Sequence, residues 1–396
     1  MKKYLLIMSA LCSGGAFAQS CTTTISPGTN LASAVSSAAA GSTICLNSGN
    51  WGSTSLSGIV KTDYVTIRSA TGVGAVVVPT ITGGTQFVRL SSLTIGGAAI
   101  NGANTKHIAV TNSVFTQKMD VNTNGFNNND ILIDGNTFNS IGSGGGTEGR
   151  LNVYWPGGPG TVAAGVTVSN NTFDKGGCSD GIQLGAYGVV VGPGNYFGSL
   201  PQGSCTEHVD AIQGYGQSHS VIRGNYFVRP RVCLGFYDGG AAEVFENNVF
   251  VGNGADGTQC VIDLGSLTST SFKHNTLHNV SPRVGGINSS AGGSGTYTEN
   301  IMISSSFNGG PSGSCTSCTF THNLFSSGGN GTNNLTGTPT FTGGSLPTTL
   351  AGWQLASSSI GYRAALDATD MGALIGSTTA PAPVTLTPPA SLRVLP

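Results

Sequence analysis

The chain has 396 residues, of which 62 are glycine, only 8% are charged, and the formal net charge is −1. This near-neutral charge gives a nucleic-acid partner no electrostatic support. The 38% of residues that are hydrophobic recur in short runs bounded by turn residues, which argues against a disordered chain and is typical of β-strands. A chain of this length can bury a large core, in one elongated domain or in several compact ones.

The first 18 residues have the pattern of a secretory signal peptide. Lys2 and Lys3 are basic, and Leu5 to Leu11 form an apolar run that is too short to span a bilayer. Ala16-Phe17-Ala18 fits the rule for cleavage after small residues. We therefore expect residues 1–18 to be removed and the protein to be secreted or periplasmic, with no membrane partner.

Eight cysteines follow this segment, and an even number in an exported chain predicts disulfides rather than metal ligands. Cys315 and Cys318 lie in a Gly/Ser loop, so a local structural disulfide is a better interpretation than a redox site. Spacing favours bonds between sequential neighbours throughout. The expected pairs are Cys21–Cys45, Cys178–Cys205, Cys233–Cys260 and Cys315–Cys318.

One short signature, Asn-x-Phe or a close relative of it, returns along the chain after short β-type runs. Successive copies lie 23 to 27 residues apart, except for two longer steps of 35 and 30 residues. A nearly fixed step of this length indicates a solenoid in which each repeat forms one turn. The Asn residues of the signature are Asn112, Asn136, Asn171, Asn195, Asn225, Asn248, Asn275, Asn300 and Asn323.

The residues of one repeat explain how such a turn forms. Alternating Val and Ile point inward, and the Thr, Ser and Arg between them point outward. Asn at a corner tolerates the left-handed backbone of a sharp bend, and its amide can bond the Asn one coil away. The Phe that follows can stack in the core, while each strand pairs in parallel with its equivalent in the next turn. His274 and His322 directly precede corner Asn residues, so we expect them on the solenoid surface.

This pattern, over roughly residues 50 to 345, resembles the right-handed parallel β-helix of the pectate-lyase-like superfamily. The resemblance implies an all-β fold, a right-handed parallel β-helix (solenoid) with an N-terminal cap, in which Leu31 begins a short amphipathic helix. Segments beginning at Trp353 and Asp370 resemble the closing segment of secreted β-helix proteins, and we expect a monomer. The expected divisions are a signal peptide (1–18), an N-terminal cap (19–50), the parallel β-helix (51–345), a C-terminal closing segment (346–379) and a Pro-rich tail (380–396).

Two coils in the middle of the chain carry near copies of one motif, Asp-x-Ile-Gln, at residues 180–183 and 210–213. The two longer steps place insertions beside these copies, at residues 142–149 and 199–207. Insertions in a solenoid leave as loops on one face, and that face is often where ligands bind. We therefore expect the functional surface on this face.

Counting back from the corner Asn residues sorts the side chains of these coils into columns, whose members lie about 4.8 Å apart in neighbouring coils. The count stacks His208 on Arg231 and Asp180 on Asp210, with Glu207 next to His208. Because like charges stacked so closely repel, one of the two aspartates is expected to hold a proton. Such a cost is more readily tolerated at a site than in a scaffold.

This set of side chains suits the elimination of a 4-linked uronic acid. The reaction needs a cation at the substrate carboxylate, a base for the C5 proton, and a proton donor for the leaving oxygen. Arg231 suits the first role and His208 the second, with Asp180 and Asp210 as acidic support. Tyr154 is the candidate for the third role or for stacking a sugar ring. Some uronate-acting β-helix lyases and C5-epimerases are similar, with an outward His beside acidic residues and an Arg one coil later.

We therefore predict a secreted polysaccharide lyase whose partner is an acidic polysaccharide substrate. Other polar and aromatic side chains near the predicted catalytic set are candidates for holding that substrate. A polar strip in one column also suits sugar hydroxyls, and Asp263 returns to the column of the two glutamines. The candidates are Arg150, Trp155, Gln183, Gln213 and Glu207.

The sequence requires no cofactor for this chemistry. Asp180, Asp210 and Glu207 nevertheless offer the hard oxygen ligands that Ca²⁺ prefers, so a calcium site is a second interpretation of the same residues.

Two other functions fit this face. Asp180 and Asp210, stacked in adjacent coils, could approach the separation of about 5–5.5 Å found in retaining glycoside hydrolases. The clustered Asp motifs and the Gly-His-Gly that mark polygalacturonases of this fold are absent from the sequence. The chain could also be a non-catalytic carbohydrate-binding solenoid, in which His208 fills a loop and Asp210 caps a turn. Arg231 separates these hypotheses, since a hydrolase of neutral glycan needs no cation at a substrate carboxylate.

Overall fold

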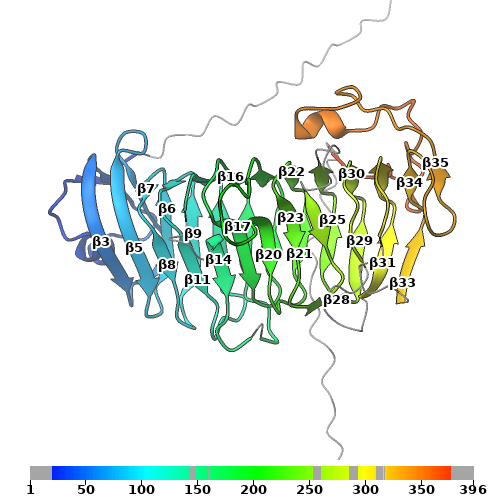
Figure 1. The fold of residues 1–396 in the computed structure, drawn as a ribbon. Coiled ribbons are helices and arrows are strands. Elements are labelled where there is room, and N and C mark those ends of the chain that lie inside the picture. The colour runs from blue at the N-terminus through cyan, green and yellow to red at the C-terminus, as the bar shows by residue number, and fades with distance from the viewer. Residues whose placement is uncertain are drawn as a thin grey trace, which may run out of the picture.

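The computed structural model describes residues 20–142, 149–158, 160–252, 260–284, 293–308, 315 and 317–375. Over these residues the chain winds into a parallel β-solenoid of about 11 turns, which confirms the predicted parallel β-helix. The turns follow one another in chain order along an elongated body (Figure 1). The predicted signal peptide (1–18) and Pro-rich tail (380–396) lie outside the described residues, as do residues 143–148 of the first insertion. No helix among the described residues is long and apolar enough to cross a membrane.

Equivalent strands of successive turns lie side by side and form rows along the solenoid. Neighbouring strands within a row pair in parallel. In the first row side chains alternate between the core and the surface, as in β12, where Ile131 and Ile133 are buried and Asp134 is half-buried. Its strands are β1 (Thr23–Ile25), β2 (Thr43–Leu46), β4 (Val60–Ser69), β6 (Gln86–Ser91), β9 (Lys106–Thr111), β12 (Ile131–Asp134), β15 (Val166–Ser169), β18 (Val190–Val191), β21 (Val221–Arg223), β25 (Val244–Glu246), β29 (Thr270–Lys273), β31 (Ser294–Thr298) and β33 (Ser317–Thr321).

The second and third rows belong to one sheet, because the long strand β5 pairs with both β7 and β8. The second row follows the Asn corner. Its strands are β3 (Gly49–Ser57), β5 (Ala75–Thr82), β7 (Thr94–Ile95), β10 (Val114–Phe115), β13 (Thr137–Asn139), β16 (Thr172–Asp174), β19 (Tyr196–Phe197), β22 (Tyr226–Val228), β26 (Val249–Val251), β30 (Thr276–His278), β32 (Ile301–Ile303), β34 (Leu324–Phe325) and β35 (Leu335–Thr336).

The third row lies in the middle of the body, where β14, β17, β20 and β23 run side by side (Figure 1). Its strands are β8 (Ala98–Ile100), β11 (Met119–Asn122), β14 (Gly149–Tyr154), β17 (Asp180–Gly185), β20 (Asp210–Gly214), β23 (Val232–Gly235) and β27 (Val261–Asp263). A separate pair is formed by β24 (Gly240–Ala241) and β28 (Leu267–Thr268).

A ladder of Asn side chains runs through the corner between the first and second rows, as predicted. Asn195, for example, donates from Nδ2 to Oδ1 of Asn225 in the next coil at 2.9 Å. The left-handed backbone that we expected at these Asn residues falls instead on the residue before each, such as Gly194. Asn112 is the exception, because it has the positive φ itself, and Ser113 takes the ladder position in its coil.

The Phe residues of the signature stack on one another inside the solenoid, which confirms the predicted core. Their ring centroids are 4.3 to 5.0 Å apart, and the rings are nearly parallel. Each such contact adds about 0.5–1.5 kcal/mol to the burial of the rings. The stack comprises Phe115, Phe138, Phe173, Phe197, Phe227 and Phe250.

The N-terminal cap contains the expected helix, α1 (Leu31–Ser37). Asn30 caps this helix by accepting a hydrogen bond from the Ser33 backbone N–H at 2.9 Å. Leu31 and Val35 lie one turn apart and are buried against the solenoid core. All four predicted disulfides are present, with Cα–Cα distances between 4.5 and 5.6 Å.

The described part of the C-terminal segment runs back along the outside of the second row, above β22, β30 and β34 in Figure 1. In the 3₁₀ helix η1 (Leu350–Trp353), Trp353 donates from its indole nitrogen to the Tyr226 hydroxyl at 3.3 Å. Farther along, the Leu374 backbone N–H donates to Asn247 Oδ1 at 3.1 Å. These contacts bury a second hydrophobic cluster outside the solenoid core.

The C-terminal segment also covers His274, so the prediction that this residue lies on the surface was wrong. His274 Nε2 is 2.9 Å from Glu299 Oε2, and Glu299 Oε1 accepts a hydrogen bond from the Leu366 backbone N–H at 2.9 Å. His274 faces out of the solenoid as expected, but the C-terminal segment packs over it and buries it. His322 is half-buried beside the Thr321 hydroxyl.

Candidate active site

One continuous column of residues follows the third row along the solenoid. The strand register aligns its members in consecutive coils, so the predicted strip of Gln183, Gln213 and Asp263 is confirmed as part of one column. Single bridges continue it to Arg283 and then to Asn308. Its members within the strands are Asp120, Asn152, Gln183, Gln213, Gly235 and Asp263.

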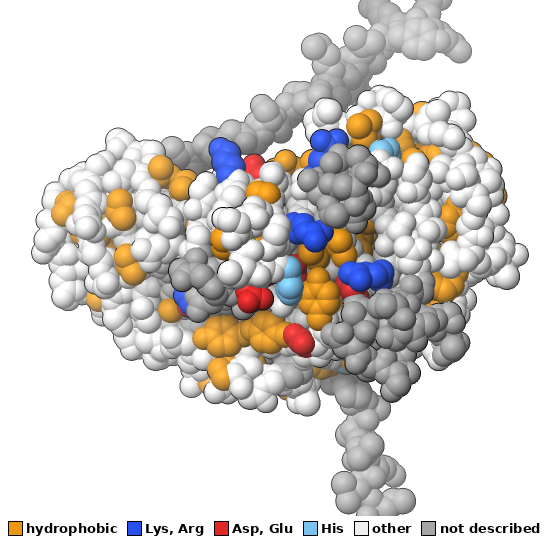
Figure 2. Space-filling view, viewed as in Figure 1, with side chains coloured by type: hydrophobic (Ala, Val, Ile, Leu, Met, Phe, Trp, Pro, Cys, Tyr) orange, Lys and Arg blue, Asp and Glu red, His pale blue; other side chains and the backbone are white. Residues whose placement is uncertain are grey.

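Gly235 interrupts this column in the middle. A Cβ at this position would collide with Asp210 Oδ2 and with the Tyr237 ring, so the absence of a side chain makes room for both. On this face, histidine, acidic, basic and hydrophobic side chains gather over the centre of the molecule (Figure 2). The break in the column thus coincides with the gathering of ionisable groups.

His208 and Asp210 form a hydrogen-bonded pair beside this gap. His208 Nδ1 is 3.0 Å from Asp210 Oδ1, and the imidazole is 42% exposed while the Asp210 side chain is fully buried. Because a carboxylate only accepts, Nδ1 carries the proton and Nε2 is left unprotonated. The hydrogen bond that His208 donates to Asp210 raises the pKa of His208, and the charges of Asp210 and Glu207 act in the same direction.

Asp180 supports the pair from the preceding coil. Its Oδ1 accepts a hydrogen bond from the Asp210 backbone N–H at 2.7 Å, and its Oδ2 accepts from Gln183 Nε2 at 3.2 Å. Burial raises the pKa of Asp180 to about 8, and the charge of Asp210 adds to this effect. The aspartate expected to hold a proton is therefore Asp180, as its neutral form avoids two adjacent buried charges.

Arg231 lies one register position away from the one we predicted. Asp210 pairs with Val232, so the strand register sets Arg231 level with Val209 rather than with His208. The count assumed coils of equal length, but this coil has one extra residue between its strand and Asn248. The Arg231 charge nevertheless lowers the pKa of Asp210, opposing the effect of burial.

Tyr237 is the aromatic residue at His208, and sequence reasoning missed it. Its ring centroid is 5.0 Å from that of His208 in an edge-to-face contact. Burial raises the pKa of Tyr237, and the nearby charges of Asp210 and Asp263 raise it further. Its hydroxyl therefore stays protonated at neutral pH. The only signal in the sequence was its position two residues after Gly235.

Tyr154, the predicted proton donor, belongs to a different part of the row. It pairs with Gly185 on β17, and a Cβ at Gly185 would collide with the Tyr215 ring. Burial raises the pKa of Tyr215 to about 12, with Tyr154 among its neighbours. Trp155 is half-buried, and Gly160 passes directly against its indole ring. Tyr154 and Trp155 therefore offer aromatic surface at the end of β14, two strands away from β20.

Arg150 does not reach the surface, so its prediction as a substrate-binding residue is corrected. Its side chain is fully buried and donates to the backbone carbonyls of Phe138 at 2.7 Å, Asp174 at 2.6 Å and Gly176. Burial lowers the pKa of Arg150 to about 10. Its guanidinium holds the second row against the third row, and the sequence could not show that it points inward.

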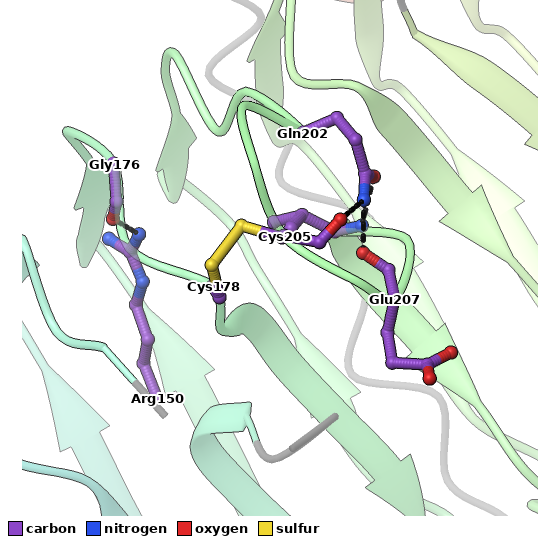
Figure 3. Close-up of a disulfide and its surroundings, with 7 residues drawn as sticks. Arg150, Gly176, Cys178, Gln202, Cys205 and Glu207 are labelled. Carbon is purple, nitrogen blue, oxygen red and sulfur yellow. Dashed lines mark hydrogen bonds between the residues drawn. A yellow bond between two sulfur atoms is a disulfide. The ribbon is translucent and has the colours of Figure 1, made fainter. Parts of the chain in front are cut away.

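The second insertion, residues 199–207, is fastened to the site by a disulfide and a glutamine (Figure 3). Cys178 and Cys205 are bonded, and Gln202 donates to the backbone carbonyls of Cys205 at 2.9 Å and of Glu207. Gln202 also accepts from the Val209 backbone N–H at 3.2 Å, immediately after His208. The Glu207 side chain extends away from Gln202 and the disulfide (Figure 3).

The predicted calcium ligands do not converge on one point. Among the described residues, one group of three His, Cys, Asp or Glu residues brings its ligand atoms within 4.8 Å of one another, and it is His274, Glu299 and Asp367. Both oxygens of Asp180 and Oδ1 of Asp210 are turned to backbone and side-chain partners instead, and Asp210 Oδ2 is buried without a hydrogen-bond partner among the described residues. The calcium interpretation of Asp180, Asp210 and Glu207 is therefore not carried further.

Neither a protein-family model nor a curated protein matches this sequence. Among solved structures, the PL6 family alginate lyase AlyGC is similar over 86% of this chain and 58% of its own, with 14% identity and a TM-score of 0.51. A variant of the same enzyme gives 13% identity and a TM-score of 0.50 over the same shares. The chain thus spans 58% of the length of these enzymes, and the likeness shows that they share the parallel β-helix fold.

Proposed function

We propose that this chain is a polysaccharide lyase that cleaves a uronate-containing acidic polysaccharide by β-elimination. The observation that carries the proposal is the His208–Asp210 pair, which presents a half-exposed imidazole with a fixed tautomer next to Tyr237, with Arg231 level with Val209 in the next coil. The fold shared with an alginate lyase makes alginate the first substrate to test. The four disulfides support an oxidising compartment, so we infer that the protein is exported.

Each group has a defined task in the reaction. Arg231 holds the carboxylate of the uronate, which stabilises the negative charge that develops when the C5 proton leaves. His208 Nε2 accepts that proton, and the C–H electrons form the C4–C5 double bond while the C4–O bond breaks. The leaving oxygen takes a proton from the Tyr237 hydroxyl. Asp210 stabilises the imidazolium that forms on His208.

The two alternative functions fit the geometry less well. Asp180 is 1% exposed and Asp210 is fully buried, so neither carboxyl reaches the surface as a nucleophile or an acid toward a glycosidic bond. A purely binding surface would not need a half-exposed histidine oriented by a buried carboxylate. Tyr154, Trp155, Gln183, Gln213 and Glu207 remain proposed contacts for the sugar chain.

The test is to incubate the purified protein with alginate, pectate, glucuronan and glycosaminoglycans. We expect both reducing ends and ultraviolet absorbance from an unsaturated uronate to increase on at least one of them. Reducing ends without absorbance would establish a hydrolase instead, and a change in uronate configuration without cleavage would establish an epimerase. No change on any of these glycans would contradict the proposed activity.

A further inference from the structure

The two halves of the third-row column differ in the charge that they present beside the Gly235 gap. On the N-terminal side, Asn152 donates to Asp120 Oδ1 at 2.7 Å, and the partly exposed Asp120 lies 3.6 Å from the Lys118 Nζ atom, so an acid and a cation are both presented. On the C-terminal side, the acidic member is Asp263, which is fully buried, and the residue bridged to it is Arg283. The C-terminal half therefore exposes the Arg283 guanidinium, whose partner carboxylate on Asp263 is buried.

Asp263 holds the Arg283 guanidinium in place. Asp263 Oδ2 is 3.1 Å from Arg283 Nη2, and the Arg283 side chain is 38% exposed. A guanidinium whose position is fixed by one carboxylate loses less conformational freedom when its remaining donors bind a second anion. Guanidinium groups bind carboxylates through two parallel hydrogen bonds, which suits a uronate.

Tyr237 connects this cation to the reacting groups. Its ring contacts His208 and lies against Gly235, which pairs with Asp263 in the next coil. The charge of Asp263 raises the pKa of Tyr237, and the charge of Arg283 lowers it. Asp263 lies two coils beyond the coil that begins at His208, and the Arg283 side chain extends back to Asp263. Two coils correspond to roughly 10 Å along the solenoid axis, a span that an extended chain of sugar rings can bridge.

We propose that Arg283 binds the carboxylate of a second uronate of the same substrate chain, which lies along the solenoid axis across the Gly235 gap. The inference rests on the proposed function and deepens it, because it requires a polymer with acidic groups on more than one ring. Arg283 is then a specificity residue that selects polyuronates over chains with isolated uronates. It takes no part in the proton transfers.

The experiment compares Arg283→Gln with wild type on size-defined oligomers of the uronate polymer that the wild type cleaves. We expect KM to rise about tenfold on long oligomers, with kcat unchanged, and to stay the same on the shortest oligomers that are cleaved. Because Arg283→Gln leaves Asp263 buried without its cation, the double variant Asp263→Asn/Arg283→Gln is measured in parallel. Arg363→Gln, a change on the C-terminal segment, is the matched control and keeps wild-type KM.

An unchanged KM at every length in the folded double variant would overturn the inference while leaving the lyase proposal intact. A fall in kcat with KM unchanged would also overturn it, since that result would place Arg283 in the chemical step. If the wild type cleaves no uronate polymer, the proposed activity fails separately. Binding of polymannuronate or polygalacturonate by calorimetry then tests the inference directly, because equal affinity of wild type and both variants would contradict it.

Discussion

Two of the histidine–carboxylate pairs among the described residues have similar N···O distances and opposite surroundings. They use different ring nitrogens, Nδ1 in His208 and Nε2 in His274. His208 lies 3.0 Å from Asp210, and its imidazole is 42% exposed. His274 lies 2.9 Å from Glu299, and its imidazole is 3% exposed because the C-terminal segment covers it. The comparison teaches that the pair by itself does not indicate chemistry. What distinguishes the two is whether a substrate can reach the imidazole.

The carboxylates of the two pairs, Asp210 and Glu299, also differ in the residues that surround them. Asp210 is supported by a second acid, Asp180, and lies next to a glycine that opens the surface. Glu299 instead accepts from the Leu366 backbone N–H and so ties the C-terminal segment to the solenoid. We therefore expect the first pair to be needed for activity and the second for stability.

The largest effect is expected for His208→Gln, which removes the proposed base without changing the core. General bases contribute about 10²–10⁴-fold to rate, so kcat/KM should fall by that factor on the cleaved glycan. The melting temperature should fall as well, because the buried Asp210 loses its partner, so both proteins are compared at a temperature at which both are folded. His322→Gln, a change at a half-buried corner residue, serves as the matched control and should keep full activity.

His274→Gln should show the reverse pattern. Removing one partner of a buried pair costs about 3–5 kcal/mol because the remaining charge stays buried. We expect the free energy of unfolding to fall by about that amount in chemical denaturation, with kcat/KM unchanged at 25 °C. A variant as stable as wild type would show that the C-terminal segment is held by its hydrophobic contacts alone.

Asp210→Asn should change the pH profile of the reaction. The base acts in its neutral form, and Asp210 raises the pKa of His208, so wild-type kcat/KM should rise with pH through a midpoint above 6.5. Loss of the carboxylate lowers that pKa and moves the rising limb to lower pH. The rate on the plateau should fall about 10- to 100-fold, since the imidazolium loses its partner. An unmoved limb would remove His208 from the role of base.

Glu243 is another buried acid, and among the described residues its Oε2 accepts from the Ser220 backbone N–H at 3.0 Å rather than pairing with a histidine. Burial raises the pKa of Glu243 to about 8, so the folded state holds this proton more tightly than the unfolded state. Its contribution is present at low pH and is lost as pH rises through about 8. Between pH 6 and 9 the free energy of unfolding of wild type should therefore fall by on the order of 2 kcal/mol more than that of Glu243→Gln, as measured by chemical denaturation. Parallel pH curves for the two proteins would contradict this assignment.

The fold could be predicted from the sequence because the same local chemistry recurs in every coil. A corner Asn needs the amide of the next coil, and a following Phe needs the ring of the next coil, so both residues return at a nearly fixed step. The disulfides followed from the same logic. At the other corners the left-handed residue was placed one position late, since the ladder and the bend use adjacent residues, as at Gly194 and Asn195.

The site could be predicted only where its members lie in regular strands. Asp180 and Asp210 lie in regular strands with matching corner counts, and His208 directly precedes one of them. The predicted position of Arg231 was wrong by one residue because its coil has one extra residue. Counting back from the corner Asn cannot show where in the coil that residue lies. Arg150 was misplaced because a sequence does not show whether a strand residue next to a loop faces inward.

The central claim is that His208 takes the C5 proton of a uronate, and the most direct test is the chemistry of the new chain ends. Wild type and His208→Gln are incubated with the same polyuronate, and the end groups are identified by mass and by ultraviolet absorbance. We expect wild type to form unsaturated ends, and we expect His208→Gln to form them at least about 10²-fold more slowly. Saturated ends from wild type, or unsaturated ends at an unchanged rate from His208→Gln, would contradict it.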